Sequence, residues 1–554
     1  ASLRQALAQG GSAEAATTFA KVTPWLDRWA AEWSAARVRV CRETELEGAR
    51  SPALGGLAEA CLDERRDELR GLLDALSDGD AASLRRAVPA VAGLSPIDPC
   101  GDPVALARRP APPDDPSARA RAQEIRRGLL RAGGLASAGR YAEALAVAEA
   151  ARAEAEALGY PPLTADARMN VGYLTARTGA IDAAIDALTR AYVDAGVVGE
   201  DEVALRAAIH LVGTVGYLAA RPAEGLTWWQ SVQMLLRRLR LDDQLLGAHA
   251  RVNVAAVYHL REEPDVAIHL LEEALALRER LLGEAHPQVA DLLVNLAEAR
   301  RARGEFDAAG ALQRRALGIY DEALGPDHPS VALVLGNLAL TERTLGHRDE
   351  ARALNRRALA IREAALGPDH PEVAISLSYL AEDAADRGEL EASMALSARA
   401  LAIREAALGP DHPDVGQSLA TMAGYHLLRG ELDEAERLLD RAVAVIEAAL
   451  GPDHVELSGA LVGVARLALA RERPRDAIAP LERAAILRAT YRPDARAEVD
   501  ALLARALWDA PEGEGRDRSR ARALAEGALE VLRSTSAPAA EIEPVEAWLV
   551  EHPG

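Results

Sequence analysis

The stretch that decides the fold is residues 283–325, which read GEAHPQVADLLVNLAEARRARGEFDAAGALQRRALGIYDEALG. Two apolar patterns lie on either side of Gly304, and both have helical spacing. Pro287 suits the first turn of a helix, where its missing N–H would have no partner in any case. Gly304 and Gly325 suit the chain reversals that end helices. The apolar face of the first pattern comprises Val289, Leu292, Leu293, Leu296 and Ala299.

The second pattern predicts a second helix, which runs back along the first. Its apolar face comprises Ala309, Leu312, Ala316 and Ile319. The stretch therefore predicts a helix–turn–helix unit. We expect small side chains where two helix backbones approach closely, at Ala297, Ala309 and Ala316.

This unit recurs every 42 residues without slippage. The glycines that follow the second helix of each unit are Gly283, Gly325, Gly367, Gly409 and Gly451. Those between the two helices are Gly304, Gly346, Gly388 and Gly430. A fixed period in this range indicates helical hairpins that stack side by side and bury one continuous core.

The segment NLAEARRARGEFDAAGALQRRALGIY (295–320) resembles the tetratricopeptide repeat in the order of its small and apolar residues. The ordinary repeat is about 34 residues long, and eight more residues add about one turn to each helix. Units of this length with an LGxxHP linker are similar to those of kinesin light chains and of many bacterial regulatory proteins. The resemblance implies an all-α, right-handed solenoid.

Weaker copies of the unit extend the array in both directions. We predict about ten hairpins between residues 120 and 535, the best formed over 247–456, and a capping helix at 536–554. A Pro- and Asp-rich linker at 108–119 separates the array from an N-terminal helical domain at 1–107.

The N-terminal domain carries a tryptophan stripe and all three cysteines. Trp25, Trp29 and Trp33 share one helix face, which predicts a place in its core. The spacing of Cys41, Cys61 and Cys100 matches no zinc motif. This spacing is compatible with buried thiols in a reducing compartment, or with one disulfide and one spare thiol in an oxidising compartment. It does not choose among the three possible disulfide pairings.

The order of the tryptophans, the cysteines and the CLDERRxEL stretch, followed by the linker and repeats, resembles the carboxy-terminal half of myxobacterial transmembrane serine/threonine kinases. The tail at 501–529 fits the same resemblance. It implies that a kinase domain and one membrane helix precede Ala1, and that this region lies outside the inner membrane. It also suggests Cys41 and Cys61 as the disulfide.

Composition excludes several functions. The net charge is −21, which disfavours nucleic acid as a partner. Lys21 is the sole lysine, and its surroundings fit neither a phosphate-binding loop nor a kinase strand. We find no HExxH or GxSxG motif and no membrane span, and predict no enzyme activity, cofactor or metal.

Histidines follow the period as well. His286, His328, His370, His412 and His454 lie one repeat apart, too far from one another to share a metal ion, and are expected to cap helices. The sequence places His210, His249, His259, His269 and His426 without a pattern, so they are interpreted as isolated side chains.

An asparagine ladder is the main candidate for binding. Asn253, Asn295 and Asn337 lie 42 residues apart, and Asn170 fits the same slot. In tetratricopeptide domains that bind peptides, Asn at this slot faces the concave groove and bonds the peptide backbone. His259, Arg301 and Arg343 would add positive charge. Tyr379 and Thr421 end the ladder. The alternative is an ancestral residue that packs between helices.

The sequence therefore predicts a non-catalytic scaffold that binds a protein or peptide segment, and it leaves open whether the chain also self-associates. Its host would be a bacterial serine/threonine kinase, with this region on the extracytoplasmic side of the inner membrane. The alternative host is a signal-transducing ATPase or a transcriptional regulator, and the region would then be cytoplasmic. A weaker alternative is an enzyme with an unrecognised site in residues 1–107.

Overall fold

The computed structural model describes residues 13–78, 80–488, 493–534 and 539–553, and within them it contains helices and no strands. The N-terminal helices are α2 (Ala13–Cys41), the π-helical turn η1 (Arg42–Leu46), α3 (Pro52–Ser77), α4 (Ala81–Arg85), α5 (Ala87–Ala92), the 3-10 turn η2 (Asp98–Cys100) and α6 (Pro103–Ala107). The predicted all-α solenoid is confirmed.

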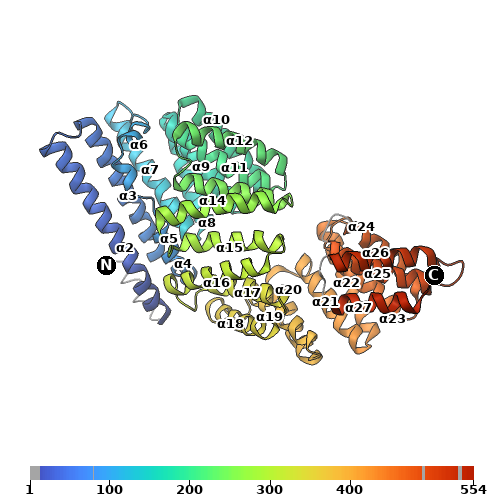
Figure 1. Cartoon of the computed structure of the whole chain (residues 1–554). Coiled ribbons are helices and arrows are strands. Elements are labelled where there is room, and N and C mark those ends of the chain that lie inside the picture. The colour runs from blue at the N-terminus through green and yellow to red at the C-terminus, as the bar shows by residue number, and fades with distance from the viewer. Residues whose placement is uncertain (1–12, 79, 489–492, 535–538, 554) are drawn as a thin grey trace. The chain divides into compact units, whose positions relative to one another are not determined.

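The array follows as antiparallel hairpins (Figure 1). Its helices are α7 (Pro116–Ser137), α8 (Tyr141–Leu158), α9 (Pro161–Arg177), α10 (Ile181–Val198), α11 (Asp201–Gly213) with η3 (Thr214–Leu218), α12 (Pro222–Leu239), α13 (Leu245–Leu260), α14 (Pro264–Leu282), α15 (Pro287–Ala302), α16 (Phe306–Ala323), α17 (Pro329–Thr344), α18 (Arg348–Leu366), α19 (Pro371–Asp386), α20 (Leu390–Leu408), α21 (Pro413–Arg429), α22 (Leu432–Leu450), α23 (Leu457–Ala470), α24 (Pro474–Leu487), α25 (Pro493–Asp509), α26 (Arg518–Ser534) and α27 (Ala539–Glu551).

The chain forms two compact units, which divide after His347. The first unit contains the N-terminal helices and the hairpins from α7 to α16, with α17. The second contains α18, the hairpins from α19 to α26, and α27. This division does not follow the predicted linker at 108–119, because α3 packs along α7 within the first unit.

The repeat unit folds as its sequence predicts. His286 caps α15, since its Nδ1 accepts a hydrogen bond from the backbone N–H of Gln288 at 3.1 Å. Gly304 turns the chain toward α16 with a φ of +84°, a conformation that costs glycine little. Ala297, Ala309 and Ala316 are fully buried, so the two backbones approach closely there.

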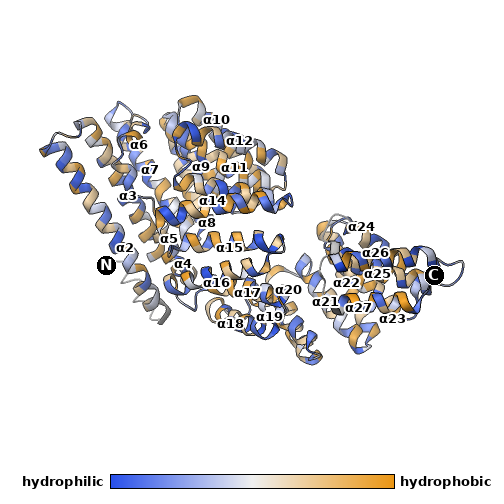
Figure 2. Ribbon diagram, in the orientation of Figure 1, coloured by the Kyte–Doolittle hydropathy of each residue, from blue (hydrophilic) through white to orange (hydrophobic). Residues whose placement is uncertain are grey.

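Hydrophobic and hydrophilic residues alternate around most helices (Figure 2). The core consists mainly of Ala, Leu, Val and Ile side chains, as expected for hairpins that each bury one face against the next.

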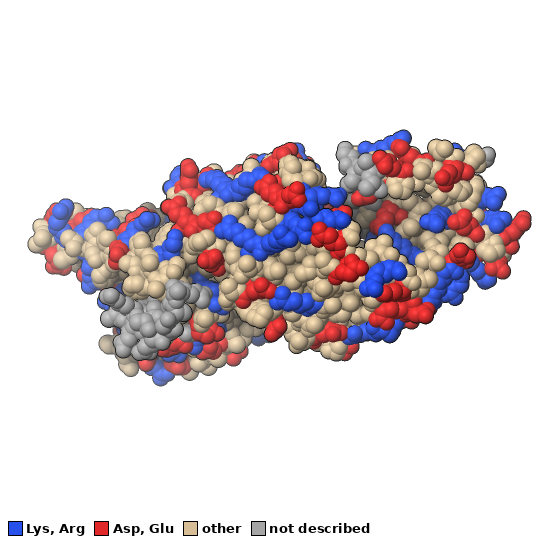
Figure 3. Space-filling view, turned by 90° about the horizontal axis from the view of Figure 1, so that it is seen from below, with Lys and Arg blue, Asp and Glu red and all other residues tan. Residues whose placement is uncertain are grey.

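Arginine–glutamate pairs link the second helices of neighbouring hairpins. In the first unit Arg315 of α16 bonds Glu279 of α14 at 2.6 Å. In the second unit the equivalent pairs, at 2.6 or 2.7 Å, are Arg399–Glu363, Arg441–Glu405 and Arg483–Glu447. Each exposed pair adds at most about 1 kcal/mol. Acidic and basic side chains are accordingly interspersed on the face seen in Figure 3.

The N-terminal helices fold back along the array rather than only preceding it. Gly71 of α3 and Gly134 of α7 meet so closely that a Cβ on Gly134 would lie 2.7 Å from the Gly71 backbone. Lys21 donates a hydrogen bond to the carbonyl oxygen of Glu322. The glycine pair and the lysine thus fix this segment to two parts of the first unit.

The tryptophan stripe divides between two surfaces. Trp29 and Trp33 pack, partly buried, against the core of the N-terminal helices, as predicted. Trp33 also donates its Nε1–H to the carbonyl oxygen of Leu62 at 2.7 Å. Trp25 instead meets His286 of the array edge to face, with ring centroids 5.1 Å apart. One residue of the predicted core therefore contacts a repeat.

The disulfide differs from the suggested pairing. Cys61 bonds to Cys100, with Cα atoms 5.4 Å apart, and Cys41 is an exposed free thiol. The suggested Cys41–Cys61 pair is wrong, because η2 brings Cys100 onto α3 in the core of the N-terminal helices, whereas Cys41 ends α2 at the surface.

Candidate functional site

The first helices of successive hairpins in the first unit carry polar pairs four residues apart. Residues at this spacing share one helix face. The pairs are Asp166–Asn170 on α9, Arg206–His210 on α11, His249–Asn253 on α13 and Asp291–Asn295 on α15, and Leu333–Asn337 on α17 has the same register. We call these faces, with Tyr173, the polar wall.

Side-chain contacts join α9, α11 and α13 into one continuous part of the wall. Arg206 bonds Asp166 at 2.7 Å. The rings of Tyr173 and His210 lie 4.7 Å apart, and those of His210 and His249 lie 6.2 Å apart. His249 then shares a hydrogen bond of 3.2 Å with the Nδ2 of Asn253.

The two wall histidines are neutral at pH 7. Burial lowers the pKa of His210 to about 3, and the neighbouring His249 and Arg206 act in the same direction. Burial also lowers the pKa of His249 to about 4, with a further contribution from Arg278. Neutral imidazoles offer one donor and one acceptor each, so this part of the wall is polar without being charged.

The next pair along the wall is held by a tyrosine. Tyr320 of α16 donates its hydroxyl hydrogen to Asp291. Burial raises the pKa of Asp291, while the Tyr320 hydrogen bond and Arg278 oppose that rise. Burial and the carboxylate raise the pKa of Tyr320. The phenol therefore stays protonated, and Asp291 is fixed beside Asn295.

The four ladder asparagines differ in what their amides do. Asn170 donates to the Asp166 carbonyl oxygen at 2.9 Å, and Asn253 is bonded to His249. Asn295 is exposed, and Asn337 is half-buried. Asn295 thus offers the most accessible amide of the ladder.

The residues predicted to add positive charge have mixed surroundings. Arg301 is paired with Glu298 at 2.5 Å, on its own helix, which compensates its charge. His259 is exposed and Arg343 half-buried, both near the ends of their helices. In the second unit Tyr379 is half-buried, and Thr421 donates to the carbonyl oxygen of Gln417 at 3.1 Å.

The interpretation of His210 and His249 as isolated side chains is wrong, because the stacking of α11 on α13 brings them together. The sequence contains one signal that identifies the wall. Asp166, His249 and Asp291 each precede a ladder asparagine by four residues, so a second polar column accompanies the first.

The periodic histidines act as caps, as predicted. His286, His328, His370 and His412 each accept a backbone N–H through Nδ1 at 3.1 or 3.2 Å and stand directly before the first helical residue. At the fifth, His454, Val455 replaces the proline, and α23 begins only at Leu457. His286 and His328 also contact the N-terminal helices, through Nε2.

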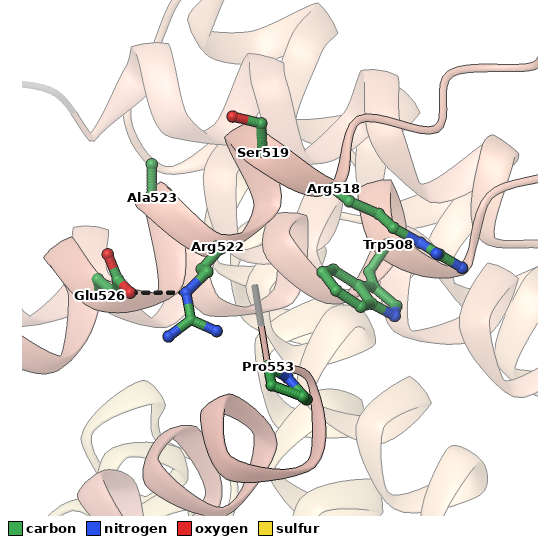
Figure 4. A pocket seen from close by; sticks show the side chains of 7 residues that line it. All are labelled: Trp508, Arg518, Ser519, Arg522, Ala523, Glu526 and Pro553. Atoms are coloured by element: carbon green, nitrogen blue, oxygen red, sulfur yellow. Dashed lines mark hydrogen bonds and ion pairs between the residues drawn. The ribbon is translucent and has the colours of Figure 1, made fainter.

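A shallow hollow lies near the C-terminal end of the second unit (Figure 4). Its lining residues are Trp508, Arg518, Ser519, Arg522, Ala523, Glu526 and Pro553. Arg522 donates to the carbonyl oxygen of His552 and to Glu526, both at 2.8 Å. The ring of His552 stacks on Trp548 at 4.6 Å. These contacts fasten α27 onto α26, which indicates a structural role.

Comparison with protein families supports the repeat assignment. The tetratricopeptide repeat model matches five overlapping stretches, 248–321, 288–364, 349–406, 372–444 and 419–487. This part of the array, residues 248–487, therefore matches tetratricopeptide repeats. A search of the curated proteins gives no significant match.

Similar solved structures cover various lengths of the chain. TPR-like repeats ascribed to a kinesin light chain of Podosopora anserina are 25% identical over 37% of this chain and 97% of that chain, with a TM-score of 0.33. Aspartyl phosphate phosphatase F of Bacillus subtilis is 15% identical over 66% and 94%, with a TM-score of 0.44. A signal transduction ATPase with a tetratricopeptide repeat sensor from Pyrococcus horikoshii is 13% identical over 70% and 53%, also at 0.44.

Among the described residues, no helix has the length and apolar character needed to cross a membrane.

Proposed function

We propose that this chain is a non-catalytic scaffold whose polar wall holds an extended protein segment. The observation that carries the proposal is the continuous row of half-buried hydrogen-bonding side chains from α9 to α13, to which α15 adds the exposed Asp291 and Asn295. A peptide backbone presents donors and acceptors in alternation, and amide and neutral imidazole side chains match both.

The charges of the wall favour backbone recognition over an ionic ligand. Asp166 and Arg206 neutralise each other, and His210 and His249 are uncharged at pH 7. Asn295 offers an exposed amide. A segment with small or uncharged side chains fits this surface without leaving a buried charge unpaired.

We further propose that the scaffold is the sensory or interaction region of a bacterial serine/threonine kinase, on the extracytoplasmic side of the inner membrane. The support is the sequence resemblance, together with the Cys61–Cys100 disulfide, since disulfides persist in oxidising compartments. The sequence that precedes Ala1 tests this host directly. A membrane helix after a kinase domain agrees with it, whereas a nucleotide-binding ATPase domain or a DNA-binding domain contradicts it.

The groove is tested by quantitative partner capture with purified wild type and the triple variant Asn253→Ala/Asn295→Ala/Asn337→Ala. We expect the captured-partner signal of the variant to be about tenfold lower than that of wild type, since each lost hydrogen bond weakens binding by about 0.5–1.5 kcal/mol. Thr421→Ala is the matched control. Thr421 occupies the same slot in a later repeat, but its hydroxyl already donates to a carbonyl oxygen of its own helix. Equal capture by wild type and triple variant, with unchanged helicity, rules the wall out.

A further inference from the structure

Two capping histidines of the first unit, His286 and His328, also bind another segment of the chain through Nε2. With Nδ1 accepting a backbone N–H, the proton of a neutral imidazole lies on Nε2, which then donates. In His286 this Nε2 is 3.3 Å from the carbonyl oxygen of Ala92, and in His328 it is 2.8 Å from that of Arg85.

Both acceptors are the last residues of short helices, because α4 ends at Arg85 and α5 at Ala92. Carbonyl groups at helix ends have no partner within their own helix. Each histidine thus joins the start of a repeat helix to the end of a helix from another segment. The segment 81–92 that docks here also carries Arg85 and Arg86.

The second unit repeats the same caps with different neighbours. In His370, His412 and His454, Nδ1 accepts the backbone N–H of the residue two positions on, at N···N distances of 3.2–3.3 Å. The residue two positions on is Gln288 or Ser330 in the first unit, but is acidic in all three repeats of the second. We call the following nine residues the acidic edge: Asp369, His370, Glu372, Asp411, His412, Asp414, Asp453, His454 and Glu456.

Four carboxylates of this edge have no partner among the described residues. Asp369, Asp411, Asp453 and Glu456 are exposed, and their side chains form no hydrogen bond or ion pair there. The other two acids are partly engaged: Glu372 lies 3.5 Å from Arg362, and Asp414 lies 4.0 Å from His412. The edge therefore presents, once per repeat, an imidazole donor beside free negative charge.

We propose that the acidic edge docks a basic helical segment of a partner protein. The helix-end carbonyls of the partner would accept from His370 and His412, and its arginine or lysine side chains would pair with Asp369, Asp411 and Asp453. The template is the segment 81–92 on the first unit, which uses the same imidazole contact. This surface is distinct from the polar wall, so the two proposals stand or fall separately.

The probe is a labelled synthetic peptide of residues 80–94 (DAASLRRAVPAVAGL), titrated against the full chain by fluorescence anisotropy. We expect binding that weakens about tenfold in Asp369→Asn/Asp411→Asn/Asp453→Asn, through the loss of three exposed charge contacts. Asp327→Asn is the matched control, since Asp327 holds the same position on the edge already occupied. A peptide with glutamine in place of Arg85 and Arg86 should bind the wild-type chain about as weakly as the unaltered peptide binds the triple variant.

Three results would overturn the proposal. They are absence of binding up to about 1 mM peptide, equal weakening by Asp327→Asn, and no change in the triple variant. Light scattering of the full chain provides a separate arm. A concentration-dependent dimer that the triple variant abolishes would assign the edge to a second copy of this chain and overturn its assignment to a partner.

Discussion

The imidazole of His328 donates a hydrogen bond to the carbonyl oxygen of Arg85, 243 residues earlier in the chain, at 2.8 Å. The same ring caps α17 by accepting the N–H of Ser330 at 3.1 Å. One side chain therefore starts a repeat helix and holds the N-terminal helices against the array.

The two roles of His328 can be separated by comparing its replacement with that of His412, which serves here as a histidine that only caps its helix. We predict that His328→Ala and His412→Ala each lower the free energy of unfolding by about 1 kcal/mol, the usual cost of a lost cap. Only His328→Ala should speed amide hydrogen exchange in residues 81–92. Equal exchange in both variants would show that the Arg85 contact does not hold the segment.

The glycine contact between α3 and α7 predicts opposite effects at adjacent positions. Gly134→Ala should destabilise the first unit by about 1–3 kcal/mol, because the new methyl group would overlap the Gly71 backbone. Gly133 has nothing within 4 Å of its Cβ position, so Gly133→Ala should be neutral or stabilise by up to about 1 kcal/mol through helix propensity. Thermal unfolding of both variants measures the difference. Similar melting temperatures would contradict the close approach.

The wall histidines predict a loss of stability in acid. Their pKa values fall from 6.5 to about 3 for His210 and about 4 for His249. Below pH 6.5 the unfolded chain binds protons that the folded chain does not, so the free energy of unfolding decreases as the pH falls toward 4. We expect His249→Asn to remove on the order of 1 kcal/mol of this dependence between pH 7 and 5.

His269→Asn is the control for that measurement, because the His269 side chain is 72% exposed on α14. Its melting curves should keep the wild-type pH dependence. The prediction fails if His249→Asn and wild type lose stability in parallel on acidification.

The disulfide predicts a thiol count. Protein purified without reductant should show one reactive thiol, Cys41, because Cys61 and Cys100 are bonded to each other. Cys61→Ala should cost about 2–4 kcal/mol in the N-terminal helices, as expected for a closed loop of this length. Three reactive thiols in the native wild type would contradict the bond, and Cys41→Ser should leave stability unchanged.

The sequence by itself determined the repeat. Its 42-residue period, with proline at the start of a helix and glycine after its end, specifies where each helix of the best-formed units lies. These signals are local, since a cap, a turn or an apolar face involves residues only a few positions apart. The same locality made the capping role of His286 and its equivalents predictable.

Only the tertiary structure decided which distant residues meet. The Cys61–Cys100 bond, the His210–His249 pair and the Arg85–His328 contact join residues 39, 39 and 243 positions apart. Spacing along the chain does not encode such contacts, because they depend on how one helix packs on another and on where the N-terminal helices fold back. The asparagine column was visible in the sequence, whereas the neutral, half-buried character of the wall beside it arises from burial by the stacked helices.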